Sequence, residues 1–438
     1  MKNRRTFIKT GLAAGALVAG GMPGCSEKSA RNNTRNHPLA GVERENIRIR
    51  DVKVTLLSCE LPADQQWYLD WIPERYKCWK TDSILVEVET DAGLRGIGGC
   101  TQYGVPHQIK AYVENTIKPA IIGQNPFDIE FLTAGVLDRG PMVGWAGIEA
   151  ALWDIIGKAK GKPVNEFLAI DHEPVYRIPV YASAGEMYEG DVWPDNLIAE
   201  ALEMKKKGFR AYKFRPGTHW SVSGMTMGKY IEGVWKIREA VGPDFGLIQE
   251  CNAQWNMEQV MQFIPEAERM NLIWIEDPTI RYGEEAKKNY IRIKETLDKV
   301  LLSYGGDTMN NRFDYKEWID RKAMDIVQPD AGVMGITETW YVSRMAHLQG
   351  HVCAPHNWHG ALMTLMNAHI AGGIPNLIML ETNQTFNPLR TDLLKEPLVF
   401  RDGFLELPKK PGLGIEVIDD AAERFPFIPG TYDKPRPL

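Results

Sequence analysis

The most constraining feature of this sequence is a series of short apolar segments, each of which ends in an acidic residue or a histidine. One of them reads LIWIE, at residues 272–276. The ends of the six segments are Glu250, Glu276, Asp307, Asp330, His356 and Glu381. Successive ends are 26, 31, 23, 26 and 25 residues apart, which is about the length of a strand, a helix and two short loops. The spacing therefore predicts strands that alternate with helices.

The segments between these strands carry apolar residues at intervals of three and four, as at residues 257–270 and 336–350, which predicts helices. Two further strand-and-helix units begin at residues 178–185 and 209–217. Eight such units predict a β/α barrel, in which all the parallel strands end at one mouth. The acidic residues and the histidine at the strand ends are therefore expected to lie together there.

The composition is that of a globular protein with a small-molecule partner. The chain has 438 residues, 44% of them hydrophobic, which is ample for a buried core and about two domains. Its formal net charge of -6, and the lack of a basic run after residue 35, give no sign of a nucleic-acid-binding surface.

The N-terminal segment NRRTFIKTGLAAGALVAGGMPGC has paired Arg4 and Arg5 ahead of a short apolar stretch. It resembles a twin-arginine export signal, and the apolar stretch is too short to span a bilayer. We therefore expect export by the twin-arginine route and a periplasmic or envelope-associated protein. Cys25 is a candidate for a lipid anchor, although Pro23 suits such a motif poorly. The signal and a polar linker make up residues 1–45.

Residues 46–170 are expected to form an α+β domain that precedes the barrel. Their first part alternates apolar and polar residues around the turn at residues 91–93, which predicts an antiparallel hairpin, and helical patterns follow. The barrel is predicted at residues 171–396. Residues 397–438 carry strand and turn signals again, and we expect them to return to the first domain.

An aromatic stretch lies between the first two predicted strands, at residues 63–80. It includes Trp67, Tyr68 and Arg75. Exposed aromatic side chains beside an arginine suit a lid that closes over an anionic ligand, so these three residues are predicted to contact substrate. The alternative is that they pack between the two domains.

Five motifs together resemble those of one protein family: AGIEAALWDIIGKAKGKPV, YKFRPG, IVQPDAGVMGITE, APHNWHG and PGLGIEV. Over residues 46–420 the chain resembles the mandelate racemase and muconate lactonizing enzyme family of the enolase superfamily. The resemblance implies a modified TIM barrel, (β/α)7β, with an N-terminal α+β capping domain. It also implies a Mg²⁺ ion, chemistry that begins with removal of the proton beside a carboxylate, and a homo-oligomer.

Three carboxylates at one mouth repel one another and are hard to keep ionised without a cation. Oxygen ligands favour Mg²⁺, so we expect Glu250, Glu276 and Asp307 to hold this ion. The family pattern at these positions is aspartate, glutamate, glutamate, and this chain departs from it twice. Asn252, on the same face as Glu250, is expected to contact a metal ligand or the substrate. The alternative is a set of solvated loop carboxylates.

His356 and Asp330 end adjacent predicted strands. A carboxylate that holds one imidazole nitrogen orients the ring and makes it a stronger base. By resemblance this pair is the catalytic dyad of the family, with His356 as the base. His359, three residues further on, is a candidate for the loop that lines the substrate site.

Lys213 and Arg215 lie two residues apart on one predicted strand, so their side chains face the same way. The family often has a lysine base at the second position, but a guanidinium does not lose its proton at useful pH. The sequence therefore predicts a reaction with one base, in which Lys213 and Arg215 bind the substrate carboxylate. The resemblance assigns to Glu381, when protonated, a hydrogen bond to the enolate oxygen.

A single histidine that removes the α-proton can also return it to a leaving β-hydroxyl. We therefore expect an acid-sugar dehydratase that makes a 2-keto-3-deoxy acid. A cycloisomerase or epimerase of a sugar acid or lactone would use the same enolate. A glycoside hydrolase on a barrel would use two of the carboxylates and need no metal. The remaining alternative is an exported, non-catalytic protein that binds a sugar acid.

Overall fold

The structure is a computed structural model of the chain. It describes residues 37–69, 71–73, 76–101, 105–137, 142–186, 193–216, 219–306 and 309–433. Arg75, Asp307, Cys25 and the segment that resembles an export signal lie outside these residues. Within the described ranges, no helix has the length and apolarity needed to cross a membrane.

The capping domain is built on an antiparallel sheet of three strands in the order β1 (Ile49–Glu60), β4 (Lys80–Thr90), β5 (Arg95–Cys100). The helices of this domain are α2 (Pro106–Tyr112), α3 (Lys118–Ile121), α4 (Ile129–Leu137), α5 (Met142–Lys160) and α6 (Val164–Leu168), with a π-helix at Val113–Ile117. Helix α5 packs directly on β5. A Cβ at Gly96 would lie 2.0 Å from Ala151 O, and one at Gly98 would lie 2.1 Å from Gly147 O, so only glycine permits this approach.

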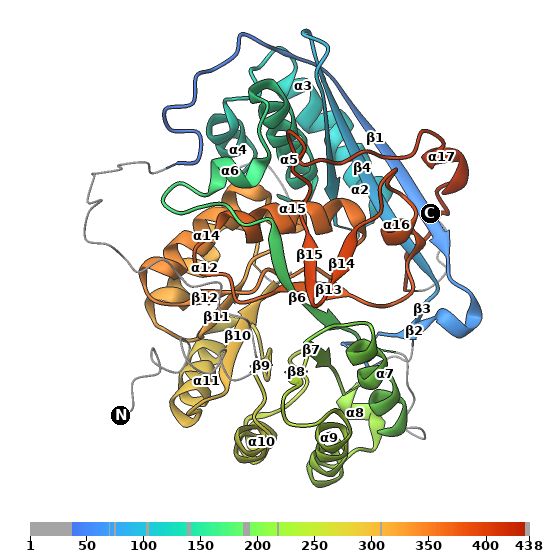
Figure 1. The fold of residues 1–438 in the computed structure, drawn as a ribbon, viewed down its shortest axis with the longest axis vertical. Coiled ribbons are helices and arrows are strands. Elements are labelled where there is room, and N and C mark those ends of the chain that lie inside the picture. The colour runs from blue at the N-terminus through green and yellow to red at the C-terminus, as the bar shows by residue number, and fades with distance from the viewer. Residues whose placement is uncertain are drawn as a thin grey trace.

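The barrel follows, and its strands run in sequence order around the sheet (Figure 1). They are β6 (Arg177–Ser183), β7 (Ala211–Phe214), β8 (Gly246–Glu250), β9 (Trp274–Glu276), β10 (Leu301–Gly305), β11 (Ile326–Gln328), β12 (Val352–Cys353) and β13 (Leu380–Asn383). Neighbouring strands are parallel, and β13 pairs with β6. A parallel bridge between Cys353 and Leu377 joins β12 to the chain before β13 and closes the barrel.

Each pair of successive barrel strands is connected through a helix. These helices are α7 (Asp195–Lys206), α9 (Met227–Val241) after the short α8 (Trp220–Ser223), α10 (Met257–Arg269), α11 (Gly283–Thr296), α12 (Arg312–Asp320), α14 (Ile336–Leu348) after the short α13 (Ala331–Met334), and α15 (Ala361–Gly373). Helix α10 begins with a capping box between Asn256 and Gln259, as its sequence favours. The predicted (β/α)7β barrel with an N-terminal α+β domain is confirmed.

The interior of the barrel is filled by side chains. Tyr181 and Trp274 are fully buried there and meet edge to face, with ring centroids 5.2 Å apart. Ile248, Leu301 and other apolar residues complete this inner cluster. The charged side chains at the strand ends therefore stand above a packed, mainly apolar interior.

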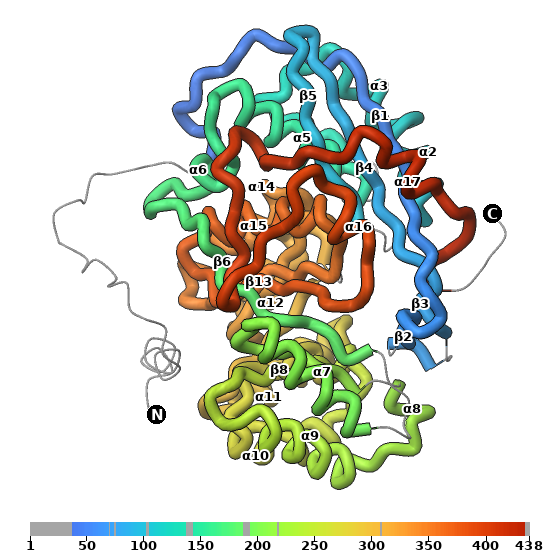
Figure 2. Tube along the Cα trace, turned by 45° about the vertical axis from the view of Figure 1, so that its right-hand side comes forward, coloured from blue at the N-terminus to red at the C-terminus, as the bar shows by residue number. Residues whose placement is uncertain are grey.

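The C-terminal segment serves both domains. The hairpin of β14 (Val399–Arg401) and β15 (Phe404–Glu406) extends the barrel sheet, because β15 pairs antiparallel with β6. The chain then crosses back over the capping domain to α17 (Ala421–Arg424), beside β1 (Figure 2). The sequence assigned the whole segment to the first domain, but its hairpin belongs to the barrel. The short α16 (Pro388–Thr391) precedes this hairpin.

Candidate active site

Two buried glutamates meet at the ends of β8 and β9. Glu250 and Glu276 are register partners on these neighbouring strands, and both side chains are almost completely buried. Burial, and then the negative charge of Glu276, raise the pKa of Glu250 well above its ordinary value. Burial also opposes the ionisation of Glu276, but Lys213 and hydrogen bonds outweigh it and lower the pKa of Glu276. One charge and one proton are the state of this pair without a further cation.

The ammonium of Lys213 lies among three glutamates. Its Nζ is 2.5 Å from Glu276 Oε1, 2.9 Å from Glu381 Oε1 and 3.3 Å from Glu250 Oε2. Burial disfavours the charge on Lys213, but the three carboxylates outweigh burial and raise its pKa. The three carboxylates therefore favour the charged form of Lys213 at the mouth of the barrel.

Glu381, on β13, is an acceptor in this arrangement. The backbone N–H of Asn357 donates to its Oε2 at 2.9 Å. Burial raises the pKa of Glu381, but the charges of Lys213 and His356 outweigh it and lower the pKa overall. The hydrogen bond from a protonated Glu381 to the enolate oxygen, which the resemblance implies, stays a prediction.

The cluster fits a divalent cation. Glu250, Glu276 and Glu381 carry up to three negative charges, and Lys213 supplies one positive charge. Carboxylate oxygens are the donors that hard cations prefer, and two touching, buried glutamates are stabilised in their ionised form by such an ion. The predicted third ligand, Asp307, lies outside the described residues.

The predicted dyad is assembled between the ends of β11 and β12. Asp330 is the N-cap of α13, and its Oδ1 accepts hydrogen bonds from the backbone N–H of Gly332 at 2.7 Å and from Asn367 Nδ2 at 3.1 Å. Its Oδ2 faces His356 Nδ1 at 2.7 Å. The other ring nitrogen of His356, Nε2, lies 3.9 Å from Glu381 Oε2, which places this histidine beside the glutamate cluster.

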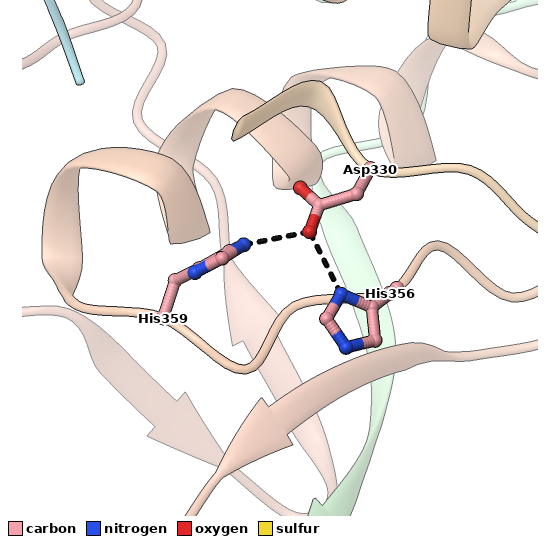
Figure 3. A group of neighbouring side chains, drawn as sticks. All are labelled: Asp330, His356 and His359. Atoms are coloured by element: carbon pink, nitrogen blue, oxygen red, sulfur yellow. Dashed lines mark hydrogen bonds and ion pairs between the residues drawn. The ribbon is translucent and has the colours of Figure 1, made fainter. Parts of the chain in front are cut away.

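His359 does not line the site as the sequence suggested. Its ring is completely buried, and its Nε2 lies 2.6 Å from the same Asp330 Oδ2 that faces His356 (Figure 3). Burial opposes the charge of Asp330, but the two histidines outweigh it and hold the pKa of Asp330 well below its ordinary value. The ligand atoms of these three residues lie within 4.8 Å of one another. Two N–H donors on one oxygen account for this proximity without a metal ion.

The loop after β12 supplies four consecutive functional side chains from the motif HNWH. His356 belongs to the dyad, and Asn357 holds Glu381 through its backbone N–H and through Nδ2, which donates to Glu381 O at 3.0 Å. The ring of Trp358 carries the guanidinium of Arg215, with Cζ 4.2 Å from the ring centroid. Only the two histidines of this loop were predicted as site residues, although the density of polar and aromatic residues in HNWH was a usable signal.

Arg215 is held by protein groups at the mouth. Its Nε forms an ion pair with Glu186 Oε1 at 2.7 Å, and its Nη1 donates to Ala184 O at 2.8 Å. Both charged side chains are buried. Glu186 was missed from the sequence, although it directly follows the strand predicted at residues 178–185. The positive charge of Arg215 is thus partly offset by Glu186, and the contact of Arg215 with the substrate carboxylate stays a prediction.

The aromatic stretch forms a small ribbon of β2 (Trp67–Tyr68) and β3 (Lys77–Cys78), which follows a 3₁₀ turn at Ala63–Gln65. Trp67 is 4% exposed and meets the ring of Trp358 edge to face at 6.0 Å. The backbone N–H of Tyr68 donates to Glu186 O at 3.1 Å. The ribbon therefore covers the barrel mouth and packs between the domains at the same time.

Asn252 lies in the turn after β8, with a left-handed φ of 47°. Its backbone N–H donates to Glu250 Oε1 at 2.8 Å, and its side-chain Oδ1 accepts from Arg281 Nη2 at 3.3 Å. Arg281 also pairs with Asp277 at 2.9 Å. Asn252 thus orients a predicted metal ligand through its backbone.

Fold and site together define a capped-barrel enzyme whose mouth holds an acidic cluster beside a histidine base. The chain belongs to the enolase superfamily: residues 196–421 match the family described as enolase C-terminal domain-like. Residues 77–169 match the N-terminal domain of the mandelate racemase and muconate lactonizing enzyme family. The family predicted from the sequence is confirmed.

Relatives of the chain are dehydratases of sugar acids and a cycloisomerase. An arabinonate dehydratase of Saccharolobus solfataricus is 27% identical over 355 residues, which cover 78% of this chain and 90% of the relative. A D-galactarolactone cycloisomerase of Agrobacterium fabrum is 28% identical over 359 residues, which again cover 78% and 90%. The solved structure of an enolase superfamily member from Polaromonas sp. JS666 has a TM-score of 0.76 at 26% identity, and the match covers 88% of this chain and 99% of that chain.

Proposed function

We propose that this protein removes the proton beside the carboxylate of a sugar acid and eliminates water to give a 2-keto-3-deoxy acid. The observation that supports this best is the position of His356. Asp330 holds its Nδ1, and its Nε2 lies 3.9 Å from Glu381 at the edge of the charged cluster. A base beside oriented charges suits the removal of a weakly acidic proton next to a carboxylate.

In the first step, His356 Nε2 accepts the α-proton. The electron pair of the broken C–H bond forms a double bond to the carboxylate carbon, and negative charge develops on the two carboxylate oxygens. Lys213, a buried cation, balances part of this charge. Asp330 stabilises the imidazolium that forms, because it accepts the hydrogen bond from Nδ1.

In the second step, the new double bond shifts to lie between the α- and β-carbons as the β-carbon–oxygen bond breaks. The leaving hydroxyl takes the proton back from His356 and departs as water. The enol that remains tautomerises to the 2-keto-3-deoxy acid. One base serves both steps, and Arg215 cannot act as a second base because its guanidinium keeps its proton. This supports a dehydratase over a racemase with two bases.

We propose Mg²⁺ as the metal, held by Glu250, Glu276 and Asp307. When bound, Mg²⁺ supplies positive charge opposite the developing negative charge of the substrate carboxylate. Support comes from the two buried glutamates at neighbouring strand ends, whose oxygens suit a hard cation. The chain's departure from the family pattern of ligands concerns the length of two side chains and not the type of donor.

A cycloisomerase of a sugar lactone is the second candidate. It is favoured by the relative from Agrobacterium fabrum, which is as similar to this chain as the dehydratase from Saccharolobus solfataricus. His356 would remove the same proton, and the leaving group would be a ring oxygen that stays attached to the product. The two reactions therefore differ in whether water is released.

Proton NMR in D₂O with Mg²⁺ and a panel of sugar acids and lactones tests the proposed function. We expect loss of the α-proton signal with a new 2-keto-3-deoxy product. In His356→Asn, the rates of exchange and of product formation should both fall by at least about a thousandfold. His351→Asn is the matched control, because His351 precedes β12 at the opposite end of the strand from His356. Exchange without water loss would favour a cycloisomerase or epimerase, and no exchange with any compound would favour the binding protein.

The metal is tested on the same assay. EDTA should abolish exchange and added Mg²⁺ should restore it, while Glu276→Gln should weaken Mg²⁺ binding measured by calorimetry more than Asp277→Asn does. Asp277 is the control because it is paired with Arg281. Exchange that survives EDTA would contradict the proposed role of the metal, whereas hydrolysis of a glycoside that survives EDTA, without α-proton exchange, would favour a barrel hydrolase.

We propose that the chain is exported by the twin-arginine route to the periplasm or envelope, with Cys25 as a candidate lipid anchor, and that it forms a homo-oligomer. The paired Arg4 and Arg5 support export. Fractionation of cells should find the full chain outside the cytoplasm, and Arg4→Lys with Arg5→Lys should retain it inside.

A further inference from the structure

The dyad contains a second imidazole that the proposed reaction does not use. His356 Nδ1 lies 2.7 Å and His359 Nε2 lies 2.6 Å from one oxygen, Asp330 Oδ2. The two rings are nearly perpendicular, at 85°, with centroids 5.8 Å apart (Figure 3). A dyad needs one histidine and one carboxylate, so the second histidine calls for an explanation.

The hydrogen bonds fix where the protons lie. An ionised carboxylate oxygen only accepts hydrogen bonds, so both imidazoles must present an N–H to Asp330. His356 therefore carries its proton on Nδ1, and its Nε2 is the basic nitrogen when the ring is neutral. His359 carries its proton on Nε2. The low pKa of Asp330 agrees with a carboxylate that stays ionised under both donors.

His359 cannot contact substrate from its position. It is completely buried, whereas the side chain of His356 retains 13% exposure. Asp330 separates the two rings, and its Oδ1 is occupied by Gly332 N–H and Asn367 Nδ2. With four donors on its two oxygens, the carboxylate has no acceptor position left. The strength of the hydrogen bond from each imidazole to Oδ2 therefore depends on the bond from the other.

We propose that His359 is a positioning residue that sets the basicity of His356 by sharing its carboxylate. Each donor to Oδ2 withdraws electron density from the bond to the other donor. Asp330 therefore stabilises the protonated form of His356 less than it would with His356 alone. The effect keeps His356 unprotonated, and so ready to accept a proton, at a lower pH.

Two further charged side chains of the described residues bear on His356. Glu381 from β13 lies 3.9 Å from Nε2, and Lys213 from β7 pairs with Glu381 at 2.9 Å. Gly306, directly after β10, lies beside the ring of His356. A Cβ at this position would lie 3.2 Å from His356 Cδ2. Glu381 approaches His356 from the side of Nε2, whereas His359 shares Asp330 Oδ2 with His356 Nδ1, so a change at His359 reaches His356 through Asp330.

The reach of the side chain gives a sharp test. The amide nitrogen of glutamine stands as many bonds from Cα as imidazole Nε2, whereas that of asparagine stands as many as Nδ1. His359→Gln can therefore keep a donor to Asp330, and His359→Asn, of the same chemical type, cannot. We expect the titration midpoint of His356 to rise by about one pH unit in His359→Asn and to stay near that of the unaltered protein in His359→Gln.

The measurement is a ¹⁵N NMR titration of histidine-labelled full chain without substrate, with His356→Asn to assign the signal. His369→Gln is the control, because His369 is equally buried but bonds only to backbone atoms in the described contacts. Circular dichroism and thermal unfolding identify variants that fail to fold. A midpoint that is unchanged in His359→Asn, or that moves equally in both His359 variants, would overturn the proposal.

The catalytic consequence rests on the proposed function and is measured separately. In the exchange assay, the acid limb of kcat/KM should move to higher pH by the same amount in His359→Asn, with kcat at high pH nearly unchanged. If no sugar acid reacts, the proposed function fails while the NMR titration still decides the role of His359. If the midpoint moves but the acid limb does not, His359 sets the basicity of His356, but His356 is not the base that governs the rate, and the proposed function fails.

Discussion

At the scale of single residues, the buried histidines of this protein are defined by the atoms they face. His359 faces a carboxylate, whereas His369, on α15, faces two backbone groups. Its Nδ1 accepts from the backbone N–H of Asn165 at 3.2 Å, and its Nε2 donates to Leu413 O at 3.1 Å. A second proton on His369 would lie on Nδ1, where it would face the backbone N–H of Asn165 and remove that hydrogen bond.

This arrangement predicts how stability depends on pH. Burial lowers the pKa of His369 from 6.5 to about 4, so below pH 6.5 the unfolded chain takes up a proton that the folded chain refuses. The contribution of His369 is complete above about pH 6.5 and is lost progressively as the pH falls towards 4, by about 2 kcal/mol at pH 5.

Urea unfolding of the unaltered protein and of His369→Asn, each at about pH 7.5 and 5, measures this loss. His369→Asn should be less stable at pH 7.5, because the donor to Leu413 O is removed. The difference between the two proteins should shrink by about 2 kcal/mol at pH 5. A difference that does not change with pH would contradict the assignment of a neutral, buried His369.

At the scale of elements, one carboxylate joins the capping helix α5 to the sheet and to the C-terminal chain. Asp154 accepts from the backbone N–H of Ile97 on β5 at 2.9 Å and from that of Leu413 at 2.8 Å. Lys158 donates to it at 2.7 Å. Gly412, with a left-handed φ of 78°, lets the chain pass so close that a Cβ would lie 2.1 Å from Asp154 Oδ1. The PGLG motif is therefore a requirement of packing.

Gly412→Ala should destabilise the protein far more than Gly93→Ala. Both glycines have nearly the same φ, 78° and 77°, so both variants carry a backbone cost of roughly 1–2 kcal/mol. A Cβ at Gly93 meets no described atom within 4 Å. At Gly412 it displaces Asp154, and about 2 kcal/mol more is lost as buried N–H groups lose their acceptor. Equal losses in urea unfolding would show that Asp154 is not displaced.

At the scale of the whole molecule, the C-terminal tail supports the ribbon that covers the barrel mouth. Trp79 Nε1 donates to Thr431 O at 2.8 Å, and its backbone N–H donates to Tyr432 O at 3.0 Å. Tyr432 also packs on the small apolar cluster that contains Trp67. Since Trp67 meets Trp358 in the catalytic loop, one chain of contacts links the tail to the site.

Removal of residues 428–438 should therefore loosen the ribbon without dismantling the dyad. We expect hydrogen exchange of residues 61–80 to accelerate by about tenfold or more. KM should rise more than kcat falls, because the base and its carboxylate belong to the barrel. Truncation after Asp433 is the control, as it leaves the contacts of Trp79 in place. Unchanged exchange after the larger deletion would contradict this role of the tail.

Much of the fold could be predicted because its signals are periodic. Apolar runs at near-regular spacing specify a barrel, and parallel strands then place their ends at one mouth. The residues at those ends, such as Glu250, Glu276 and His356, were found for that reason. Glu186 was missed although it directly follows the strand predicted at residues 178–185, whereas Asn357 was missed because it acts mainly through its backbone N–H.

The sequence by itself determined the family, the barrel and which residue types stand at its mouth, because hydrophobic periodicity and short motifs are local properties of the chain. Only the tertiary structure decided which of these groups contact one another and which face the site. His359 was a candidate for the substrate loop and lies behind Asp330, and Arg215, which is predicted to bind the substrate carboxylate, is held in place by Glu186 and Trp358. Such roles depend on which atoms share one hydrogen-bond acceptor or one counter-ion, and that is set by contacts between distant segments, not by spacing along the chain.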